Sequence, residues 1–302
     1  MNSVKLTISA ALAQAEANGL DRMDAEYLIL FALQRTPTER AWLRVNHHEP
    51  LATCLSTTFQ ELCKRRHAGE PLAYITGSRG FYGLELAIDS RVLDPRPDTE
   101  TLVDWALDVI RGQHSPHVLD LGTGSGAIAL AIQHQKREAK VWATDASTDA
   151  LDVARANAAR LGLDIHFQHG SWLAPLLGAN TDRVTASHPF GPSCAHPTFD
   201  LIVSNPPYIA EGDPHLPALT HEPIGALTSG PDGLRDIRQI IQQSPACLKA
   251  GGWLLLEHGY DQAAAVTDIL LAGGFTHIQS RKDLAGIERC TGGQWLPRAS
   301  DG

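Results

Sequence analysis

Apolar positions follow two different patterns along this chain, and the change falls near residue 72. Before it, apolar residues recur at helical spacing, as in Leu55, Phe59, Leu62 and Cys63. From residue 117 onward, short unbroken apolar runs alternate with longer amphipathic stretches. Unbroken runs are typical of strands buried on both faces, so the alternation predicts a parallel sheet covered by helices.

The two patterns predict individual elements. In the N-terminal part, Asp21 is the expected N-cap of a helix over residues 25–33, and Thr36-Pro37-Thr38-Glu39 has the form of a capping box. Further along, strands are predicted at 117–121, 140–144, 164–168, 198–204, 252–257, 274–280 and near 287–296. Helices are predicted at 101–110, 126–135, 147–161, 232–248 and 260–272.

Residues 72–93 differ from both parts, because aromatic and aliphatic side chains are interspersed with Gly77, Gly80 and Gly83. This composition predicts a β-hairpin that links two domains. The expected organisation is a helical bundle over residues 1–71, a hairpin linker over 72–95 and an α/β domain over 96–302. Glycines and prolines mark residues 178–197 as a loop inserted into the last domain.

The strongest chemical signal is Asn205-Pro206-Pro207-Tyr208, directly after the predicted strand 198–204. The prolines end the strand ladder and leave the carbonyls of Asn205 and Pro206 at the carboxyl edge of the sheet, where α/β proteins bind ligands. Two acceptors and an aromatic ring suit a planar NH2 group. The acceptors take its two hydrogens, and the ring covers its face.

A glycine loop, Gly122-Thr123-Gly124-Ser125-Gly126, lies between the predicted strand 117–121 and a predicted helix. Such a loop brings backbone N–H groups close to a ligand at a helix N-terminus. The spacing also fits the loose dinucleotide-binding fingerprint, with Asp145 about where the ribose-binding acid falls, so a dehydrogenase competes at this point. Asp120 before the loop and the later Asn-Pro-Pro-Tyr segment favour a methyltransferase that uses S-adenosylmethionine.

Composition and charge narrow the class of protein. A formal net charge of −9 argues against a general nucleic-acid binder, which needs a basic face. The five cysteines are scattered without a Cys-x-x-Cys pair, so neither a disulfide framework nor a zinc site is expected. We see no signal peptide and no apolar run long enough to span a membrane, and we expect a cytoplasmic protein.

Seven segments together resemble the PrmC/HemK family, the protein-(glutamine-N5) methyltransferases of peptide-chain release factors. The segments are 81–85 (Phe-Tyr-Gly-Leu-Glu), 95–100 (Pro-Arg-Pro-Asp-Thr-Glu), 120–126, 170–172, 205–208, 257–262 (Glu-His-Gly-Tyr-Asp-Gln) and 283–289. DNA adenine methyltransferases share motifs like Asn-Pro-Pro-Tyr, whereas the other spelled segments are specific in combination. The chain departs from the family at Asp94 and Asp98, where Ile and Glu are usual, and in the 178–197 insertion.

The resemblance implies a Rossmann-like class I methyltransferase sheet of seven strands, the last antiparallel, and an N-terminal helical domain that engages class I release factors. It implies methyl transfer from S-adenosyl-L-methionine, which becomes S-adenosyl-L-homocysteine, to the side-chain nitrogen of a glutamine in a Gly-Gly-Gln motif. No metal is expected. The implied cofactor-binding residues are Gly122, Thr123, Gly124, Ser125 and Gly126 for the methionine moiety, Asp145 for the ribose, Trp172 near the adenine, and Asn205. The implied substrate-binding residues are Asn205, Pro206, Pro207 and Tyr208, with Asn205, Pro206 and Tyr208 as the catalytic ones.

Two alternative functions remain open. An exocyclic-amine methyltransferase of the adenine-N6 type would need the same NH2 geometry, on a flipped base. Residues 171–248 carry seven acidic and three basic side chains, which would repel phosphates and accept a basic protein loop, so direct nucleic-acid binding is not expected. A module that binds the cofactor without catalysis is disfavoured by the intact Asn-Pro-Pro-Tyr segment.

Three sites have plain structural alternatives. Asp145 could serve only as the N-cap of the helix 147–161, and Trp172 could be a core residue. Gly292-Gly293-Gln294 copies the tripeptide of the family's substrate, and we expect it to form a turn in the last strand.

Overall fold

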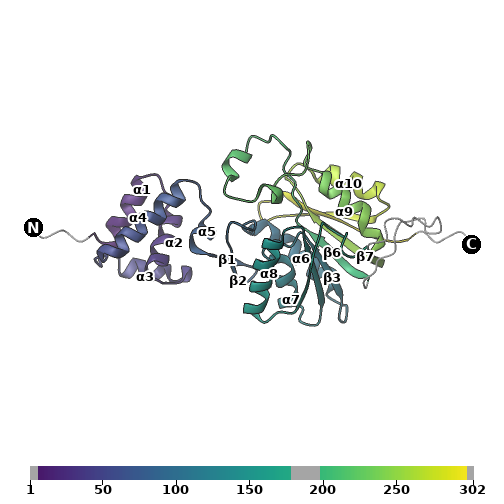
Figure 1. Cartoon of the computed structure of the whole chain (residues 1–302), viewed down its shortest axis with the longest axis horizontal. Coiled ribbons are helices and arrows are strands. Elements are labelled where there is room, and N and C mark those ends of the chain that lie inside the picture. Colours follow the sequence, from purple (N-terminus) through teal and green to yellow (C-terminus); the bar gives the residue numbers. More distant parts are fainter. Residues whose placement is uncertain (1–5, 178–197, 298–302) are drawn as a thin grey trace, which may run out of the picture. The chain divides into compact units, whose positions relative to one another are not determined.

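The computed structural model describes residues 6–177 and 198–297. The chain divides into two compact units, Met1–Ser78 and Arg79–Gly302. Figure 1 shows the first as a group of helices and the second as a sheet between helices. The loop predicted at 178–197 lies outside the described residues.

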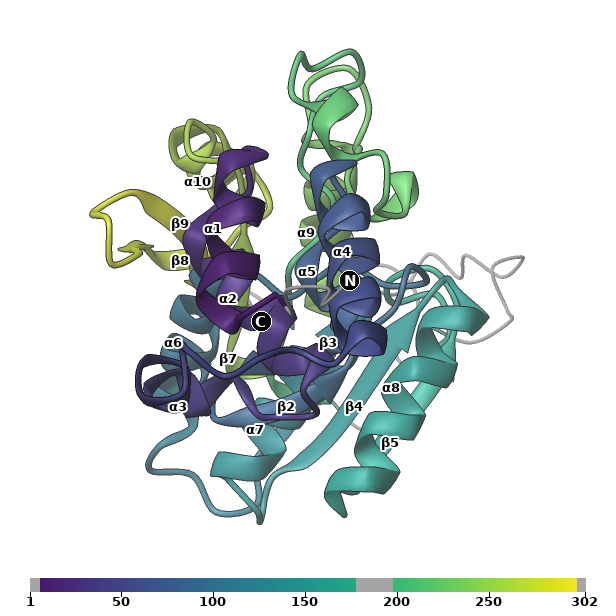
Figure 2. The ribbon, with the colours of Figure 1, turned by 90° about the vertical axis from the view of Figure 1, so that its left-hand side faces the viewer.

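The first unit is helical and has a hydrophobic core of its own. Asp21 caps the second helix by accepting from backbone N–H groups of its first turn, and Thr36 and Glu39 form the predicted capping box. The first and fourth helices both pack on the second (Figure 2). The elements are α1 (Ile8–Ala17), α2 (Arg22–Ala32), the 3-10 helix η1 (Pro37–Glu39), α3 (Arg40–Val45), α4 (Thr53–His67) and α5 (Leu72–Thr76).

Helix α5 corrects the predicted extent of the hairpin, which began at residue 72. The helix ends at Gly77, whose φ of 75° lies in the left-handed region. Ile75 is buried in the core of the helical unit, and Leu72 packs against it. Burial against this core stabilises a single helical turn that is too short to show a period in the sequence.

The hairpin consists of β1 (Ser78–Phe81) and β2 (Leu84–Ala87). Its turn residues, Tyr82 and Gly83, have φ values of 48° and 77°, and a turn with two positive φ values matches the twist of the strands. The Tyr82 backbone N–H donates to Glu100 Oε1 over 2.9 Å, and its hydroxyl donates to Asp104 Oδ1 over 2.6 Å. The turn is thereby held to α6 (Glu100–Ile110), which follows the 3-10 helix η2 (Pro97–Thr99).

The second unit is built on a seven-stranded sheet of order β5-β4-β3-β6-β7-β9-β8. The strands β3 to β7 are parallel, and β9 is antiparallel to both of its neighbours. The predicted fold class is thus confirmed. The strands are β3 (His117–Leu121), β4 (Lys140–Asp145), β5 (Ile165–His169), β6 (Phe199–Ser204), β7 (Leu248–Glu257), β8 (Thr276–Lys282) and β9 (Glu288–Gln294).

Helices cover both faces of the sheet (Figure 1). α6, α7 (Ala127–Gln135) and α8 (Thr148–Leu161) lie on one face, and α9 (Arg235–Gln243) and α10 (Ala263–Ala272) lie on the other. From β3 the chain adds β4 and β5 on one side and, after crossing over, β6 and β7 on the other. The loops after β3 and β6 are therefore neighbours at the topological switch point of the sheet, where open α/β sheets bind ligands.

Two predicted boundaries between residues 232 and 252 are wrong. α9 ends at Gln243, a short 3-10 helix η5 (Ser244–Ala246) follows, and β7 begins at Leu248. Pro245 has no N–H to continue the α-helical ladder, which ends the helix earlier than its apolar spacing indicates. Gly251 and Gly252 resemble a break between elements but lie inside β7.

Gly292-Gly293-Gln294 lie within β9, so the predicted turn is wrong. Gly292 pairs with Leu255 of β7 on one side and with β8 on the other. A Cβ at Gly292 would lie 2.5 Å from Leu255 Cδ2 and 2.6 Å from the Leu254 carbonyl oxygen. Close strand contact therefore requires glycine here. Gln294 Nε2 donates to the Gly251 carbonyl over 2.8 Å, so this tripeptide is part of the sheet.

The helices of the described ranges are each too short or too polar to cross a membrane. The described cysteines, Cys54, Cys63, Cys247 and Cys290, form no disulfide bonds with one another.

Candidate active site

The glycine loop provides space more than hydrogen-bond donors. Gly122, Gly124 and Gly126 have φ values of 68°, 55° and 86°. The N–H groups of Gly122 and Thr123 donate to the Thr144 carbonyl over 2.9 and 3.0 Å, and the Gly124 N–H donates to Asp145 Oδ2 over 2.8 Å. These N–H groups are therefore already used within the protein. What the glycines contribute is a backbone surface without side chains.

The buried side chain of Asp120 holds this loop through hydrogen bonds. Its Oδ2 accepts from Thr123 Oγ1 over 2.6 Å and from the Ala129 N–H over 3.2 Å, which joins the loop to the first turn of α7. Its Oδ1 is buried and has no hydrogen-bond partner in the described ranges. Full burial raises the pKa of Asp120 to about 7.

Asp145 ends β4 beside the glycine loop. Its Oδ1 accepts from the Ser147 N–H over 2.9 Å, and its Oδ2 accepts from Gly124. Burial raises the pKa of this carboxyl above its usual range. The N-cap of α8 is Ser147, whose side chain accepts from Ala150, so Asp145 is not the capping residue of that helix. Each Asp145 oxygen keeps a further lone pair for a ligand.

A cavity of about 440 Å³ opens at this switch point, within the size range of small-molecule sites. Its walls come from the loops after β3, β4, β5 and β6, the segment before η2, and the segment that leads into α9. The lining residues used below are Gly122, Gly124, Asp145, Trp172, Asn205 and Pro207.

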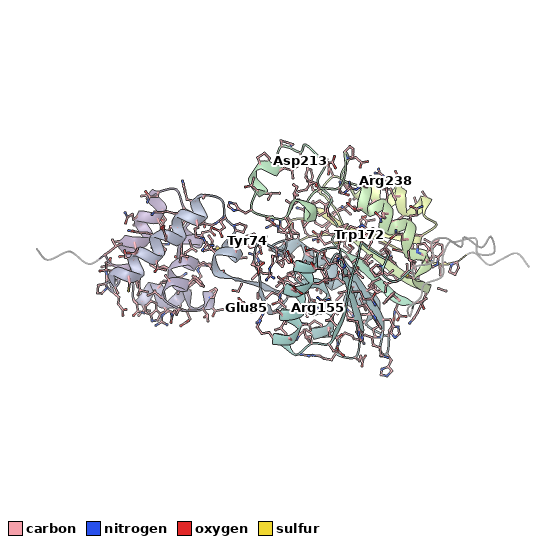
Figure 3. All side chains as sticks on the ribbon, viewed as in Figure 1. Tyr74, Glu85, Arg155, Trp172, Asp213 and Arg238 are labelled. Atoms are coloured by element: carbon pink, nitrogen blue, oxygen red, sulfur yellow. The ribbon has the colours of Figure 1, made fainter. Side chains whose placement is uncertain are left out.

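Trp172 lies on the wall of this cavity after β5 (Figure 3). A Cβ at Gly122 would lie 3.0 Å from the Trp172 ring, so ring and glycine loop are in close contact. Thr144 Oγ1 donates to the Trp172 carbonyl over 2.9 Å. Trp172 adopts a φ of 49°, which is uncommon for a bulky residue. Contacts with Gly122 and Thr144 therefore position Trp172 at the cavity, and its ring also packs against the hydrophobic core.

Asn205 follows β6 and contributes to the cavity wall. The strand ends of β3 and β6 are paired at Leu121 and Ser204, which sets the glycine loop and Asn205 side by side. Asn205 Nδ2 donates to Thr99 Oγ1 over 3.2 Å. The carboxyl of Glu257, at the end of β7, also accepts from the side chains of Asn205 and Thr99. The Asn205 amide nitrogen is thus held, while its oxygen has no partner within the described residues.

Tyr208 is held through its backbone. Its carbonyl accepts from Gln262 Nε2 over 3.0 Å, and Gln262 Oε1 accepts from the Gly259 N–H over 2.8 Å. A Cβ at Gly233 would lie 2.2 Å from the same carbonyl oxygen, so Gly233 permits a close backbone approach. Burial, with the nearby Glu257 carboxyl, raises the pKa of the Tyr208 phenol, which stays neutral at ordinary pH.

The two departures from the family pattern are both compensated by arginines. Asp94 is buried, and it lies 3.4 Å from Arg79 and 3.8 Å from Arg96. Burial raises the pKa of Asp94, while these arginines oppose the shift. Asp98 Oδ2 lies 3.2 Å from Arg289 Nη2.

The structure brings together only part of the predicted set at the cavity wall. Thr123, Ser125, Gly126, Pro206 and Tyr208 are not among the residues that line it. Thr123 and Ser125 belong to the loop but are buried.

Two residues near Asn205 had no role in the sequence interpretation beyond their place in motifs. Thr99 belongs to the Pro-Arg-Pro-Asp-Thr-Glu segment and Glu257 to Glu-His-Gly-Tyr-Asp-Gln. The available signal was Glu257 at the end of an apolar strand, where an acid is costly unless it has a partner. Among the described residues, no group of three or more His, Cys, Asp or Glu side chains could hold a metal ion.

The sheet order and the two neighbouring loops define a Rossmann-like class I methyltransferase. A family model described as "PrmC N-terminal domain" matches residues 7–77, and one described as "Methyltransferase small domain" matches residues 99–225. The release factor glutamine methyltransferase of Burkholderia pseudomallei (strain K96243) is 46% identical over 302 residues, which cover 97% of this chain and 99% of that protein. The protein of the same name from Xylella fastidiosa (strain Temecula1) is 44% identical, with 94% and 97% covered. This chain belongs to the release factor glutamine methyltransferase family.

A solved structure agrees on the fold. The catalytic domain of hMettl16, crystallised in complex with MAT2A 3'UTR hairpin 1, aligns with a TM-score of 0.56 over 89% of this chain and 93% of that one. The sequence identity is 15%, so the likeness concerns the fold alone.

Proposed function

We propose that this protein transfers a methyl group from S-adenosylmethionine to the side-chain amide nitrogen (N5) of the glutamine in the Gly-Gly-Gln motif of class I peptide-chain release factors. The observation that carries the proposal is Asn205. Its side-chain nitrogen is held by Thr99, and its oxygen has no partner in the described part of the chain, at the wall of a ligand cavity. A fixed acceptor in that place is what a primary amide requires.

The cavity residues fit S-adenosylmethionine. Gly122 and Gly124 leave a wall without side chains, and the Asp145 carboxylate can accept from ribose hydroxyls through its remaining lone pairs. The Trp172 ring offers an apolar surface for the adenine. When bound, S-adenosylmethionine supplies a methyl group activated by a sulfonium and becomes S-adenosylhomocysteine. The donor set supports this organic cofactor without a metal.

The substrate glutamine would be held by residues 205–208. Asn205 Oδ1 and the Pro206 carbonyl accept the two amide hydrogens, which raises electron density on a nitrogen that is otherwise a poor nucleophile. The Tyr208 ring covers the amide plane. Alignment of this kind contributes about 7–11 kcal/mol when the reacting atoms are 3–3.5 Å apart. After methylation the nitrogen is strongly acidic and loses its proton to water, so no strong base is required.

The charge beside the cavity supports a protein substrate over a nucleic acid. In the segment after Tyr208, Arg235 lies 3.3 Å from Asp236, and Arg238 lies 2.6 Å from Asp232. Asp213 lies on the part of this segment that projects away from the sheet (Figure 3). These arginines are neutralised by carboxylates, which leaves little to bind phosphates and an environment that suits a basic protein loop.

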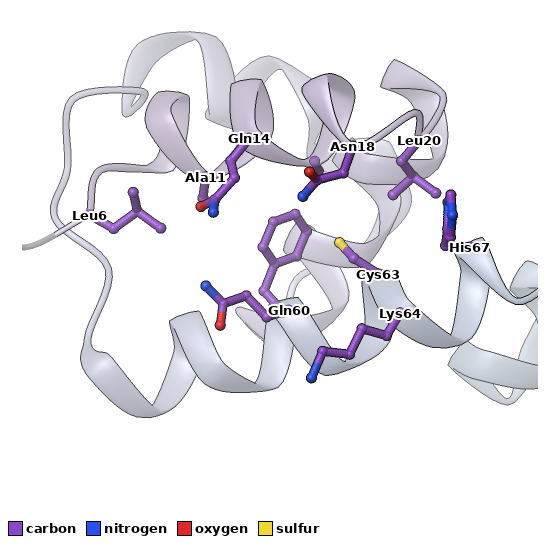
Figure 4. Close-up of a pocket in the computed structure, with 11 residues that line it drawn as sticks. Leu6, Ala11, Gln14, Asn18, Leu20, Gln60, Cys63, Lys64 and His67 are labelled. Carbon is purple, nitrogen blue, oxygen red and sulfur yellow. The ribbon is translucent and has the colours of Figure 1, made fainter.

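The helical unit is the proposed docking module for the folded release factor. It contains a groove of about 590 Å³ between α1 and α4 (Figure 4). Apolar side chains that include Leu20 and Phe59 line the groove, while Gln14, Gln60 and Lys64 supply polar and basic groups. Among the described residues, no acidic side chain lines it. An apolar surface of a protein partner could bury here without leaving a carboxylate unpaired.

One experiment tests the proposed activity. The protein is incubated with labelled S-adenosylmethionine and a purified class I release factor, and the labelled residue is mapped by mass spectrometry. We expect one methyl group on the glutamine of the Gly-Gly-Gln loop, and no label when that glutamine is replaced. Equal methyl transfer to single-stranded or duplex DNA at low salt would instead support the adenine-N6 alternative.

A further inference from the structure

Glu257 lies behind Asn205 and is not explained by the proposed contacts to cofactor or substrate. Its side chain is at the carboxyl end of β7, and the residue is 1% exposed. Its carboxyl accepts from the side chains of Thr99 and Asn205, and its Oε2 has no hydrogen-bond partner within the part of the chain that the structure describes. A buried carboxyl is costly, so its presence at this position needs a reason.

The chemistry of Asn205 supplies one. An asparagine carboxamide has nearly the same shape after a half-turn about its last side-chain bond, but the turn exchanges acceptor for donor. Only one orientation offers Oδ1 to a substrate NH2 group. The other presents Nδ2, so that two donors face each other. A hydrogen-bonding neighbour must therefore favour one of the two orientations, because packing alone does not distinguish them.

Thr99 alone cannot select one orientation of the Asn205 carboxamide, because a hydroxyl can both donate and accept. Its hydroxyl has a single hydrogen, and its oxygen accepts from Asn205 Nδ2 over 3.2 Å. If the hydrogen pointed at Asn205, it would favour the wrong orientation. The Glu257 carboxylate is an acceptor only, so it takes the Thr99 hydrogen and leaves the Thr99 oxygen to accept from Asn205. Its direct contact with the Asn205 side chain favours the same orientation, with Nδ2 toward the carboxylate.

We propose that Thr99 and Glu257 are positioning residues that set the orientation of the Asn205 carboxamide, with the Glu257 carboxylate fixing the direction of the hydrogen bonds. This inference rests on the proposed function, because it assumes that Asn205 Oδ1 accepts from the substrate amide. The relay, Glu257–Thr99–Asn205, acts on turnover because it prepares the acceptor before the substrate arrives.

The protonation state of Glu257 gives the relay a signature. Burial raises the pKa of Glu257 to about 7, and Asp98 adds to the shift while Arg289 opposes it. A protonated Glu257 can donate to Thr99, whose hydrogen then points at Asn205 and favours the wrong orientation. Turnover should therefore fall as the pH drops through about 7. The titratable or charged groups around the carboxyl are Asp98, Tyr208, Arg289, Cys290 and the adjacent His258.

The test compares Thr99→Val, which keeps the shape and removes the hydroxyl, with Thr99→Ser, which restores it. We expect Thr99→Val to lower kcat about 10- to 100-fold with KM and cofactor affinity within about twofold, and Thr99→Ser to recover most of the loss. Thr267→Val is the matched control, because Thr267 donates to the Ala263 carbonyl within α10 and lies outside the site. Its kcat should not change.

The pH profile of kcat is the second measurement, and it does not depend on whether Thr99→Val folds. The native protein should lose turnover below about pH 7, and Glu257→Gln should be slow and lack that step, because its amide can donate at every pH. A Thr99→Val kcat within threefold of native, or an unchanged pH step in Glu257→Gln, would overturn the relay. If Asn205→Ala also kept native turnover, the proposed function would fail as well. An inactive Asn205→Ala would confine the failure to the relay.

Discussion

Ser204 Oγ donates to the backbone carbonyl of Leu121 over 2.7 Å, in the buried interior of the sheet. The bond joins the last residues of β3 and β6, which are also partners in the strand register. Beyond it the chain continues as the glycine loop on one side and as Asn205 on the other. The distance between the cofactor wall and the substrate acceptor is therefore set by a rigid part of the sheet.

Asn205→Ala tests the substrate acceptor. We expect kcat on a release factor to fall about 10²- to 10³-fold, as for loss of a preorganised hydrogen-bonding group in an active site. The free energy of unfolding should change by only about 1 kcal/mol, since Asn205 is half-buried and its side chain is held only by hydrogen bonds from Nδ2 to Thr99 and Glu257 among the described residues. Steady-state kinetics and denaturant unfolding measure the two effects. Native turnover in a folded variant would remove Asn205 from the mechanism.

Asp145→Asn tests the ribose contact. The amide keeps one acceptor for the neighbouring N–H groups but replaces the other with a donor, so binding of S-adenosylmethionine should weaken by about 10-fold. Asp145→Ala should weaken it further. Isothermal calorimetry gives the affinity, and Asp149→Asn is the control because Asp149 is exposed in the first turn of α8. Equal affinities in Asp145→Asn and the control would assign Asp145 to loop structure alone.

Gln60→Glu tests the docking groove. A carboxylate placed in this groove, whose described lining has no acidic side chain, would be desolvated by an apolar partner surface, so KM for a folded release factor should rise about 10-fold. A short Gly-Gly-Gln peptide should be methylated at the native rate, because it lacks the surface of the release factor that would bind the groove. Thr58→Glu, also exposed on α4 but outside the groove, is the matched control. If both substrates respond alike, the groove is not the docking surface.

The raised pKa of the buried Asp120 carboxyl should make the stability of the protein depend on pH. Its folded-state pKa of about 7 lies above the ordinary value, so the folded protein binds this proton more tightly than the unfolded chain. The contribution of Asp120 to stability is therefore present at low pH and is lost as the pH rises toward 7. Asp120→Asn should reduce the change in unfolding free energy between pH 5 and pH 8 by about 2–3 kcal/mol. Urea unfolding at both pH values measures this.

Asp164→Asn serves as the control for that comparison, because Asp164 is exposed. Its pH dependence should match that of the native protein. A native-like pH dependence in Asp120→Asn as well would mean that Asp120 stays ionised in the folded state.

Much of the architecture follows from local sequence. The unbroken apolar runs correspond to β3 and β6 within one residue, because strands buried on both faces need such runs. The predicted strands at 140–144 and 164–168 also match β4 and β5 within one residue, although β5 is only partly buried. Asp21 and the Thr36 capping box begin helices as predicted, because caps are local interactions. The apolar runs also predict that Asn205 and Asp145 lie at the ends of strands, and both residues line one cavity in the folded sheet.

What the sequence left undecided depends on contacts between distant segments. Gly292 reads as a turn residue, but it is a strand residue because β7 approaches too closely for a Cβ. The loop glycines suggested N–H donors, but Thr144 and Asp145 already use the N–H groups of Gly122 and Gly124. These contacts exist only after the strands have paired in the order of the folded sheet.

The relay shows the same division. The sequence by itself determined that an asparagine, a threonine and a glutamate stand at the ends or starts of their elements, at positions 205, 99 and 257. Only the tertiary structure decided that they meet, because residues separated by more than 50 positions are joined by sheet order and not by local spacing. Burial then raised the pKa of the Glu257 carboxyl, an effect that no isolated segment has.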